Sequence, residues 1–216
     1  MKDASLTAME SKEMEQKDLA YLDNQIEGKI FDDELSRIIY ATDASVYRVI
    51  PKAVAIPKTK KDLVKIVEFA NSHKYPLIPR AAGTSLAGQC VGEGIIVDIS
   101  RYFTEIIELN VEEKWVRVQP GVIRDQLNDY LEPFGLFFSP TTSTANRAMI
   151  GGMVGNNPSG TTSIKYGCTR DKILELDCIL SDGTSCKFGD VNSETFKKKA
   201  NQETLEGKIY QFIFDY

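Results

Sequence analysis

A run of small and hydroxyl-bearing residues follows an apolar segment in the first half of the chain. Small residues let a backbone approach a ligand closely, and successive N–H groups can then surround an anion. Thr84 and Ser85 add hydroxyl donors, and Arg80 adds a permanent positive charge. This combination favours a phosphate or diphosphate, with a tight surface turn as the alternative. The run matches neither the GxxxxGK(S/T) nor the GxGxxG pattern of nucleotide-binding loops. It reads Pro79-Arg80-Ala81-Ala82-Gly83-Thr84-Ser85-Leu86-Ala87-Gly88-Gln89.

A second segment is nearly free of charge although it is rich in hydrogen-bonding groups. Between Ser139 and Gly167 the only charged residues are Arg147 and Lys165. A surface loop normally carries more charge, whereas a site for a buried, polar, flat ligand needs this composition. A flexible linker is the alternative, but apolar residues argue against it because linkers need no apolar anchors. These anchors are Met149, Ile150, Met153 and Val154.

Short apolar runs and helix signals place both segments on a mixed framework. Helices are predicted from Thr59 to about Asn71, with Asp62 completing a capping box, and over Val122–Leu131. Asp182-Gly183 fits a two-residue hairpin turn. Strands are predicted at Ala53–Ile56, Pro76–Pro79, Ile95–Ile99, Ile106–Asn110, Trp115–Val118, Leu174–Leu180 and Ser185–Phe188.

Helical patterns occur at both ends of the chain. Apolar residues recur at spacings of three and four over residues 5–40, which predicts an N-terminal helical segment within residues 1–45. Residues 207–216 form an apolar helical pattern with no stop signal. Because strands and helices mix without regular βα alternation, we expect an α+β fold. The predicted domain, residues 46–216, would have lobes at about 46–104 and 105–190.

Composition and charge exclude several classes of protein. The chain has 216 residues with 42% hydrophobic and 26% charged residues, which is typical of a globular domain. A net charge of −5 offers no footprint for nucleic acid or an anionic membrane. No stretch approaches the roughly 20 apolar residues that cross a bilayer. We therefore expect no nucleic-acid partner, no transmembrane segment and a cytoplasmic location, with peripheral membrane association as the alternative.

No metal site is predicted from the cysteines and the single histidine. Cys90, Cys168, Cys178 and Cys186 are widely spaced and form no CxxC pair, so we interpret them as reduced core or loop thiols. His73 lies near the end of a predicted helix and is interpreted as a surface residue.

The two polar segments resemble the FAD-binding domain of the vanillyl-alcohol oxidase / p-cresol methylhydroxylase superfamily. The nearest branch contains the D-lactate, glycolate and D-2-hydroxyglutarate dehydrogenases. PRAAGTSLAGQ resembles the diphosphate loop of that family, and ANRAMIGGMVGNNPSG resembles its second flavin loop, followed by the usual YG and a DG turn. The resemblance runs from about Tyr40 to Gly189 and implies a two-lobed domain of the p-cresol methylhydroxylase type.

The resemblance also implies FAD as the cofactor and assigns its contacts. Backbone amides from Ala81 to Leu86 would hold the diphosphate. The second segment would line the flavin and its ribityl chain, and the backbone near Ile179 would reach the adenine side or the ring edge. The implied cofactor-binding residues are Pro79, Arg80, Ala81, Ala82, Gly83, Thr84, Ser85, Leu86, Gln89, Pro140, Thr141, Thr144, Ala148, Gly151, Gly152, Asn157, Ser159, Gly160, Tyr166, Gly167 and Ile179.

Two positions depart from the family pattern. Ala81-Ala82 replaces the usual Gly-Gly, which is tolerated if neither position needs a positive φ. Thr142, within the stretch Pro140 to Thr144 that would line the flavin, stands where many members carry Asp, so the resemblance supports a contact there less strongly. Some relatives attach FAD through a histidine in the first loop, but this loop has none. Non-covalent FAD is therefore predicted, with a thioether to Cys168 as the alternative.

The chemistry that the resemblance implies needs residues that this sequence lacks. Removing a hydride from a 2-hydroxyacid requires a base for the hydroxyl proton and a cation for the carboxylate. We predict no catalytic residue here and expect the chain to stop before a downstream substrate domain. The implied function is oxidation of a 2-hydroxycarboxylate by hydride transfer to flavin N5, with electrons leaving to a separate acceptor. The alternatives are a stand-alone FAD-binding or electron-transfer module, and a flavoenzyme of different chemistry.

Overall fold

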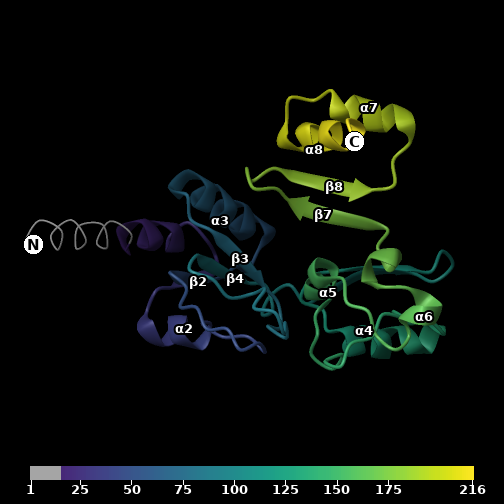
Figure 1. Ribbon diagram of the computed structural model, residues 1–216, viewed down its shortest axis with the longest axis horizontal. Coiled ribbons are helices and arrows are strands. Elements are labelled where there is room, and N and C mark those ends of the chain that lie inside the picture. The colour runs from purple at the N-terminus through teal and green to yellow at the C-terminus, as the bar shows by residue number, and fades with distance from the viewer. Residues whose placement is uncertain (1–15) are drawn as a thin grey trace, which may run out of the picture.

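The computed structural model describes residues 16–216, in which helices and small sheets are mixed (Figure 1). A helix over residues 16–23 precedes the first strand. The strands are β1 (Lys29–Phe31), β2 (Ala53–Ile56), β3 (Leu77–Arg80), β4 (Ile95–Asp98), β5 (Ile106–Asn110), β6 (Trp115–Val118), β7 (Glu175–Ile179) and β8 (Ser185–Gly189). The α-helices are α2 (Glu34–Ile39), α3 (Lys60–His73), α4 (Arg124–Leu131), α5 (Ile150–Asn156), α6 (Ser163–Tyr166), α7 (Ser193–Ala200) and α8 (Leu205–Phe214), and the short 3-10 turns are η1 (Glu132–Phe134) and η2 (Thr169–Lys172).

A four-stranded sheet in the order β1-β2-β4-β3 forms the first half of the fold. β2, β4 and β3 run parallel to one another, and β1 is antiparallel to β2. All four residues of β2 and of β4 are buried, as expected for central strands covered on both faces. The first polar segment begins where the edge strand β3 ends, at Arg80.

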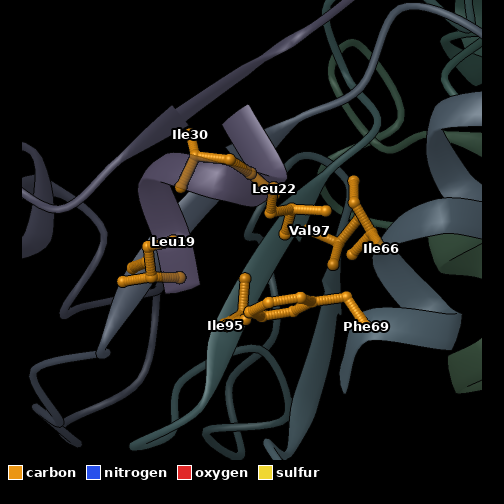
Figure 2. Close-up of a cluster of buried hydrophobic side chains, with 9 residues drawn as sticks. Leu19, Leu22, Ile30, Ile66, Phe69, Ile95 and Val97 are labelled. Atoms are coloured by element: carbon orange, nitrogen blue, oxygen red, sulfur yellow. The ribbon is translucent and has the colours of Figure 1, made fainter. Parts of the chain in front are cut away.

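Alternate residues of β2 and β4 build two separate hydrophobic clusters, one on each face of the sheet. Ala53, Ala55, Ile95 and Val97 pack against the helix over residues 16–23 and against α3. Figure 2 shows this cluster, in which Leu19 and Leu22 meet Ile66 and Phe69 over Ile95 and Val97. The opposite face carries Val54, Ile56 and Ile96, with Phe31, Tyr40 and Ile78 packed on them.

The start of α3 has the capping box predicted from Thr59 and Asp62. The Thr59 hydroxyl accepts from the backbone N–H of Asp62 at 3.2 Å. The Asp62 carboxylate, only 2% exposed, accepts N–H bonds from Glu27, Gly28 and Lys58. Burial would raise the pKa of Asp62, but these bonds and the Thr59 hydroxyl outweigh burial and hold the pKa below its usual value.

The second half of the fold contains two β-hairpins and a cluster of short helices. β5 pairs with β6, and β7 pairs with β8, each antiparallel. A third hydrophobic cluster joins α4, α5 and the β5–β6 hairpin around Leu127, Leu131, Ile150 and Met153. α7 and α8 pack together at the C-terminal end, where Phe188 of β8 stacks on Tyr210 of α8 (Figure 1).

The structure confirms the α+β fold and corrects three details. Helix over all of residues 5–40 is wrong at Lys29–Phe31, because these residues pair with β2; residues 1–15 lie outside the described part. The predicted helix from Val122 begins at Arg124. The β7–β8 turn has three residues, because Leu180 bonds Thr184 and Gly183 adopts φ +85°. Over residues 16–216, no helix combines the length and apolar character needed to span a bilayer.

Candidate flavin site

The first loop, residues 81–89, leaves β3 and turns at two glycines. Gly83 and Gly88 adopt φ values of +66° and +70°, a backbone region that side chains disfavour. Ala81 and Ala82 are not among the residues with positive φ. The Ala-Ala departure from the usual Gly-Gly therefore places no strain on the loop.

The backbone donors of the first loop are open. Among residues 16–216, the N–H groups of Ala81, Ala82, Gly83 and Thr84 donate to no protein acceptor. These residues are half-buried, so their amides are partly shielded without being paired. Buried backbone amides are nearly always satisfied, and a row of unpaired ones is suited to an anionic ligand.

Side chains of the first loop are largely engaged with the protein itself. The Ser85 hydroxyl accepts the Ala87 N–H at 3.2 Å, and it also contacts the Gln89 amide. The Arg80 guanidinium lies 5.2 Å from the ring centre of Tyr40. Pro79 and Leu86 are exposed.

The second segment is held by Arg124 at the start of α4, a residue that the sequence analysis did not connect with the site. Arg124 Nε donates to the Pro140 carbonyl at 3.0 Å, and the Arg124 N–H donates to the Ala148 carbonyl at 2.9 Å. Gly151 donates to Pro120 at 2.8 Å, and a side chain at Gly151 would collide with that proline. These contacts with Arg124 and Pro120 hold the loop before α5 and the first turn of α5 in place.

Residues 158–167 close back on the start of the second segment. The Thr162 hydroxyl donates to the Ser139 carbonyl at 2.8 Å. A Cβ placed on Gly160 would lie 2.1 Å from the Thr141 carbonyl oxygen, so only glycine permits this approach. The Thr142 and Thr144 hydroxyls lie 3.4 Å apart.

Two residues in this closing stretch turn the backbone sharply. Asn157 ends α5 at φ +47°, and its side-chain oxygen accepts the Arg170 N–H at 2.9 Å. Gly167 ends α6 at φ +79°, beside Tyr166, whose ring meets Phe137 edge-on at 5.4 Å. Ser159 is exposed on the connecting turn.

The two loops meet, although they are far apart in the sequence. Gln89 Nε2 donates to Asn156 Oδ1 at 2.8 Å. A Cβ on Gly152 would lie 3.4 Å from the Cβ of Ala81, so the first turn of α5 approaches the beginning of the first loop. The two loops are therefore in contact at Gln89 and Asn156 and at Ala81 and Gly152.

Two residues of the sequence argument lie elsewhere. Ile179 is on β7, and the β7–β8 hairpin contacts α3 where Gly183 meets Glu68. Among residues 16–216, no backbone hydrogen bond joins Ile179 to either loop. Its assignment to the adenine stays a prediction. His73 ends α3 and stacks on Phe69 at 4.1 Å, away from both loops.

The region fits FAD by its donors and by its lack of charge. Open amides on the first loop suit the diphosphate, and Gly152 presents no side chain toward Ala81 where the two loops approach each other. Within the described residues no group of three or more His, Cys, Asp or Glu could hold a metal ion. All four cysteines are free thiols.

A mixed sheet that ends in an open amide loop, facing a second glycine-rich wall, defines a cofactor-binding domain of flavoprotein type. Residues 51–189 match the family described as FAD binding domain. The chain belongs to this family of FAD binding domains, and the resemblance and the cofactor predicted from the sequence are thereby confirmed.

Curated relatives are 2-hydroxyacid dehydrogenases and oxidases. The chain is 46% identical over 188 residues to D-2-hydroxyglutarate dehydrogenase of Haemophilus influenzae, an alignment that covers 84% of this chain and 18% of the relative. The chain is 41% identical over 181 residues to D-2-hydroxyglutarate dehydrogenase of Escherichia coli, an alignment that covers 82% of this chain and 18% of the relative. Glycolate oxidase subunit GlcD of Bacillus subtilis is 34% identical over 162 residues, covering 74% and 34%. The chain thus spans 18% of the length of the dehydrogenases.

Solved structures confirm the fold. A Physcomitrella patens BBE-like 1 variant matches with a TM-score of 0.69 at 20% identity, covering 84% of this chain and 40% of its own. The 6-hydroxy-D-nicotine oxidase of Arthrobacter nicotinovorans matches with a TM-score of 0.68 at 21% identity, covering 79% and 38%. At such identities the likeness concerns the fold alone.

Proposed function

We propose that this chain is the FAD-binding part of a flavin-dependent dehydrogenase that oxidises a 2-hydroxycarboxylate. The observation that carries the proposal is the convergence of the two loops at Gln89 and Asn156, in a chain 46% identical to a D-2-hydroxyglutarate dehydrogenase. The D-lactate and glycolate relatives act on the same class of substrate by their names. Bound FAD supplies a flavin ring that accepts a hydride at N5.

Each loop has a separate task in this proposal. The unpaired amides of Ala81 to Thr84 hold the diphosphate, and Arg124 keeps the second segment in place through the Pro140 carbonyl. Gly152 leaves the flavin a surface without a side chain beside Ala81, and Gly160 lets its stretch pack closely on Thr141. The residues proposed to line the cofactor are those predicted from the sequence, Pro79 to Leu86, Gln89, Pro140, Thr141, Thr144, Ala148, Gly151, Gly152, Asn157, Ser159, Gly160, Tyr166, Gly167 and Ile179.

The cofactor is held without a covalent bond in this proposal. His73 is turned onto Phe69 at the end of α3, and the first loop contains no histidine. Cys168 would be the remaining attachment point, but its N–H and side chain cap η2 together with Asp171. Non-covalent FAD is therefore released when the protein unfolds.

The base and the cation that act on the substrate come from outside the two loops. His73 is the only histidine in the sequence, so the substrate-binding groups are proposed to lie in a further substrate domain. We also propose the domain limits predicted above, 1–45 and 46–216, with lobes near 46–104 and 105–190. A separate electron acceptor and a cytoplasmic location complete the proposal.

The substrate class is tested with the chain in its full-length gene product. D-2-hydroxyglutarate, D-lactate and glycolate are offered with an artificial dye as electron acceptor, and bleaching of the dye is followed. Dye reduction that depends on a 2-hydroxyacid supports the proposal. A product that binds FAD yet reduces dye with none of these acids contradicts the substrate class. If the gene ends at Tyr216 and a second protein co-purifies in equal amount, the module alternative holds.

A further inference from the structure

A loop N-terminal to the family match contacts the first loop of the flavin site. This 40–49 loop is closed on itself by the Val49 N–H, which donates to the Ala41 carbonyl at 2.9 Å, and by an isolated bridge between Thr42 and Arg48. Ala41 is fully buried. The 40–49 loop is therefore an ordered element, although the family match begins only at residue 51.

The 40–49 loop touches the first loop at its middle and near its end. The Ala44 N–H donates to the Gly83 carbonyl at 3.2 Å. The ring of Tyr47 lies against Gly88, where an added Cβ would be 2.7 Å from its Cδ2 atom. Because both glycines have positive φ, these contacts hold the first loop at the points where it turns.

The Arg80 guanidinium connects both ends of the first loop to Tyr40. Its Nη1 atom donates to the Tyr40 carbonyl at 3.3 Å and to the Cys90 carbonyl at 3.4 Å. The same group lies over the Tyr40 ring, and its Nη2 atom is 2.7 Å from the Cβ position of Gly83. Arg80 thus sits beneath the loop, and its charge is engaged by carbonyls and an aromatic face.

Tyr40 is itself fixed by a buried acid. Its hydroxyl donates to Asp98 Oδ2 at 2.6 Å, and Asp98 is 7% exposed at the end of β4. Asp98 also accepts the Ser100 N–H at 2.7 Å. Burial, followed by the bond to Asp98, raises the pKa of Tyr40 to about 12, so the phenol remains a donor at physiological pH.

We infer that the 40–49 loop braces the flavin site, with Tyr40 as a positioning residue that acts through Arg80. The brace keeps the amides of the first loop aimed at the diphosphate, and Arg80 supports the loop through its contacts with Tyr40 and Cys90. This inference rests on the proposed binding of FAD between the two loops. It assigns a role in cofactor binding to residues that precede the family match.

The test compares three variants of the chain. Tyr40→Leu removes the ring beneath Arg80, Tyr40→Phe keeps the ring and loses only the hydroxyl, and Tyr21→Leu changes an exposed tyrosine on the helix over residues 16–23. Hydrogen exchange is measured without FAD on peptides covering residues 41–50 and 150–156. The dissociation constant for FAD is then measured by quenching of flavin fluorescence.

We expect Tyr40→Leu to speed exchange in residues 41–50, where the Ala44 N–H bonds Gly83, but not in 150–156, and to weaken FAD binding by about tenfold. Tyr40→Phe should restore most of the affinity, and Tyr21→Leu should match the wild type. Wild-type exchange and affinity in Tyr40→Leu would overturn the brace. If Tyr40→Leu does not fold, Tyr47→Ala replaces it, with the same expected pattern and the same overturning result.

The two proposals fail in different ways. A wild-type chain that retains no FAD overturns the proposed cofactor site, and with it the role of the brace in binding. Exchange in residues 41–50 still decides whether Tyr40 holds the two loops together. Wild-type FAD binding together with equal affinity in Tyr40→Leu overturns the brace alone.

Discussion

Gln89 and Asn156 are 67 residues apart in the sequence, yet the Nε2 atom of Gln89 donates to the Oδ1 atom of Asn156 at 2.8 Å. Gln89 ends the first loop, and Asn156 ends α5. This hydrogen bond joins the two segments whose composition predicted a ligand site, and it sets the spacing between the open amides and the glycine-rich wall.

Loss of that hydrogen bond should weaken FAD binding. Gln89→Ala removes this exposed bond, worth about 1 kcal/mol, and also the contact with the Ser85 hydroxyl, so the dissociation constant for FAD is expected to rise at least about fivefold. Gln211→Ala is the matched control, because Gln211 makes an equally exposed 2.8 Å bond to Asp215 on α8. Equal FAD affinity in the two variants would show that the bond between the loops contributes nothing to the site.

Glycines in the second segment should differ sharply in their tolerance of a side chain. Gly160→Ala places a Cβ 2.1 Å from the Thr141 carbonyl oxygen, so the stretches around Thr141 and Gly160 must move apart. Gly155, on α5, has no atom within 4 Å of its Cβ position, so Gly155→Ala should stabilise the helix by about 0.5 to 1 kcal/mol. Thermal unfolding and FAD titration measure both effects.

We expect Gly160→Ala to lose most FAD affinity and Gly155→Ala to keep it with a higher Tm. Gly160→Ala with wild-type affinity would mean that the segment can open without harm to the site.

Asp62 should contribute to stability in a way that depends on pH. Asp62→Asn replaces a buried carboxylate that accepts several N–H bonds, and is expected to cost about 2 to 3 kcal/mol at pH 7. Because the pKa of the folded carboxyl is lowered, its contribution is present above the unfolded pKa and is lost as the pH falls through the folded value. The gap between wild type and variant should therefore shrink below about pH 4.

Urea unfolding at pH 7 and at pH 3 measures that gap. The control is Asp129→Asn, since Asp129 is exposed on α4, and it should change stability by no more than about 0.5 kcal/mol at either pH. A gap for Asp62→Asn that stays constant across this range would contradict the role of the charge.

Thr169 offers a substitution that should stabilise the protein. Its hydroxyl is buried and has no hydrogen-bond partner among residues 16–216. Thr169→Val removes an unpaired polar group at similar size, so Tm is expected to rise by about 2 to 4 °C. Thr59→Val is the opposite case, because the Thr59 hydroxyl bonds Asp62 twice, and Tm should fall. A lower Tm for Thr169→Val would indicate a partner for that hydroxyl.

Local signals predicted much of this fold, because they depend on neighbouring residues. The capping box at Thr59 and the buried strand at Ala53–Ile56 are read within a few positions of the chain. β1 was missed because three residues at Lys29–Phe31 become a strand only by pairing with β2. The β7–β8 turn was misjudged because Asp-Gly fits both two-residue and three-residue loops.

The residues of the site could be predicted from the sequence, whereas the contacts that hold its two loops in place could not. The small and hydroxyl-bearing residues from Ala81 to Thr84, and the glycines near α5, indicate a ligand site by their residue types. The position of Arg80 under the loop depends on Tyr40, which lies 40 residues earlier, and the hold of Arg124 on Pro140 spans 16 residues. Contacts of that range follow from the folded arrangement and leave no local pattern.

The central claim is that this chain holds FAD between the two loops without a covalent bond. The most direct measurement is the visible spectrum of the purified chain after FAD is added and gel filtration removes the excess. We predict a flavin spectrum corresponding to one FAD per chain, and complete release of the flavin when the protein is denatured. A colourless chain, or flavin that stays attached after denaturation, would contradict the account.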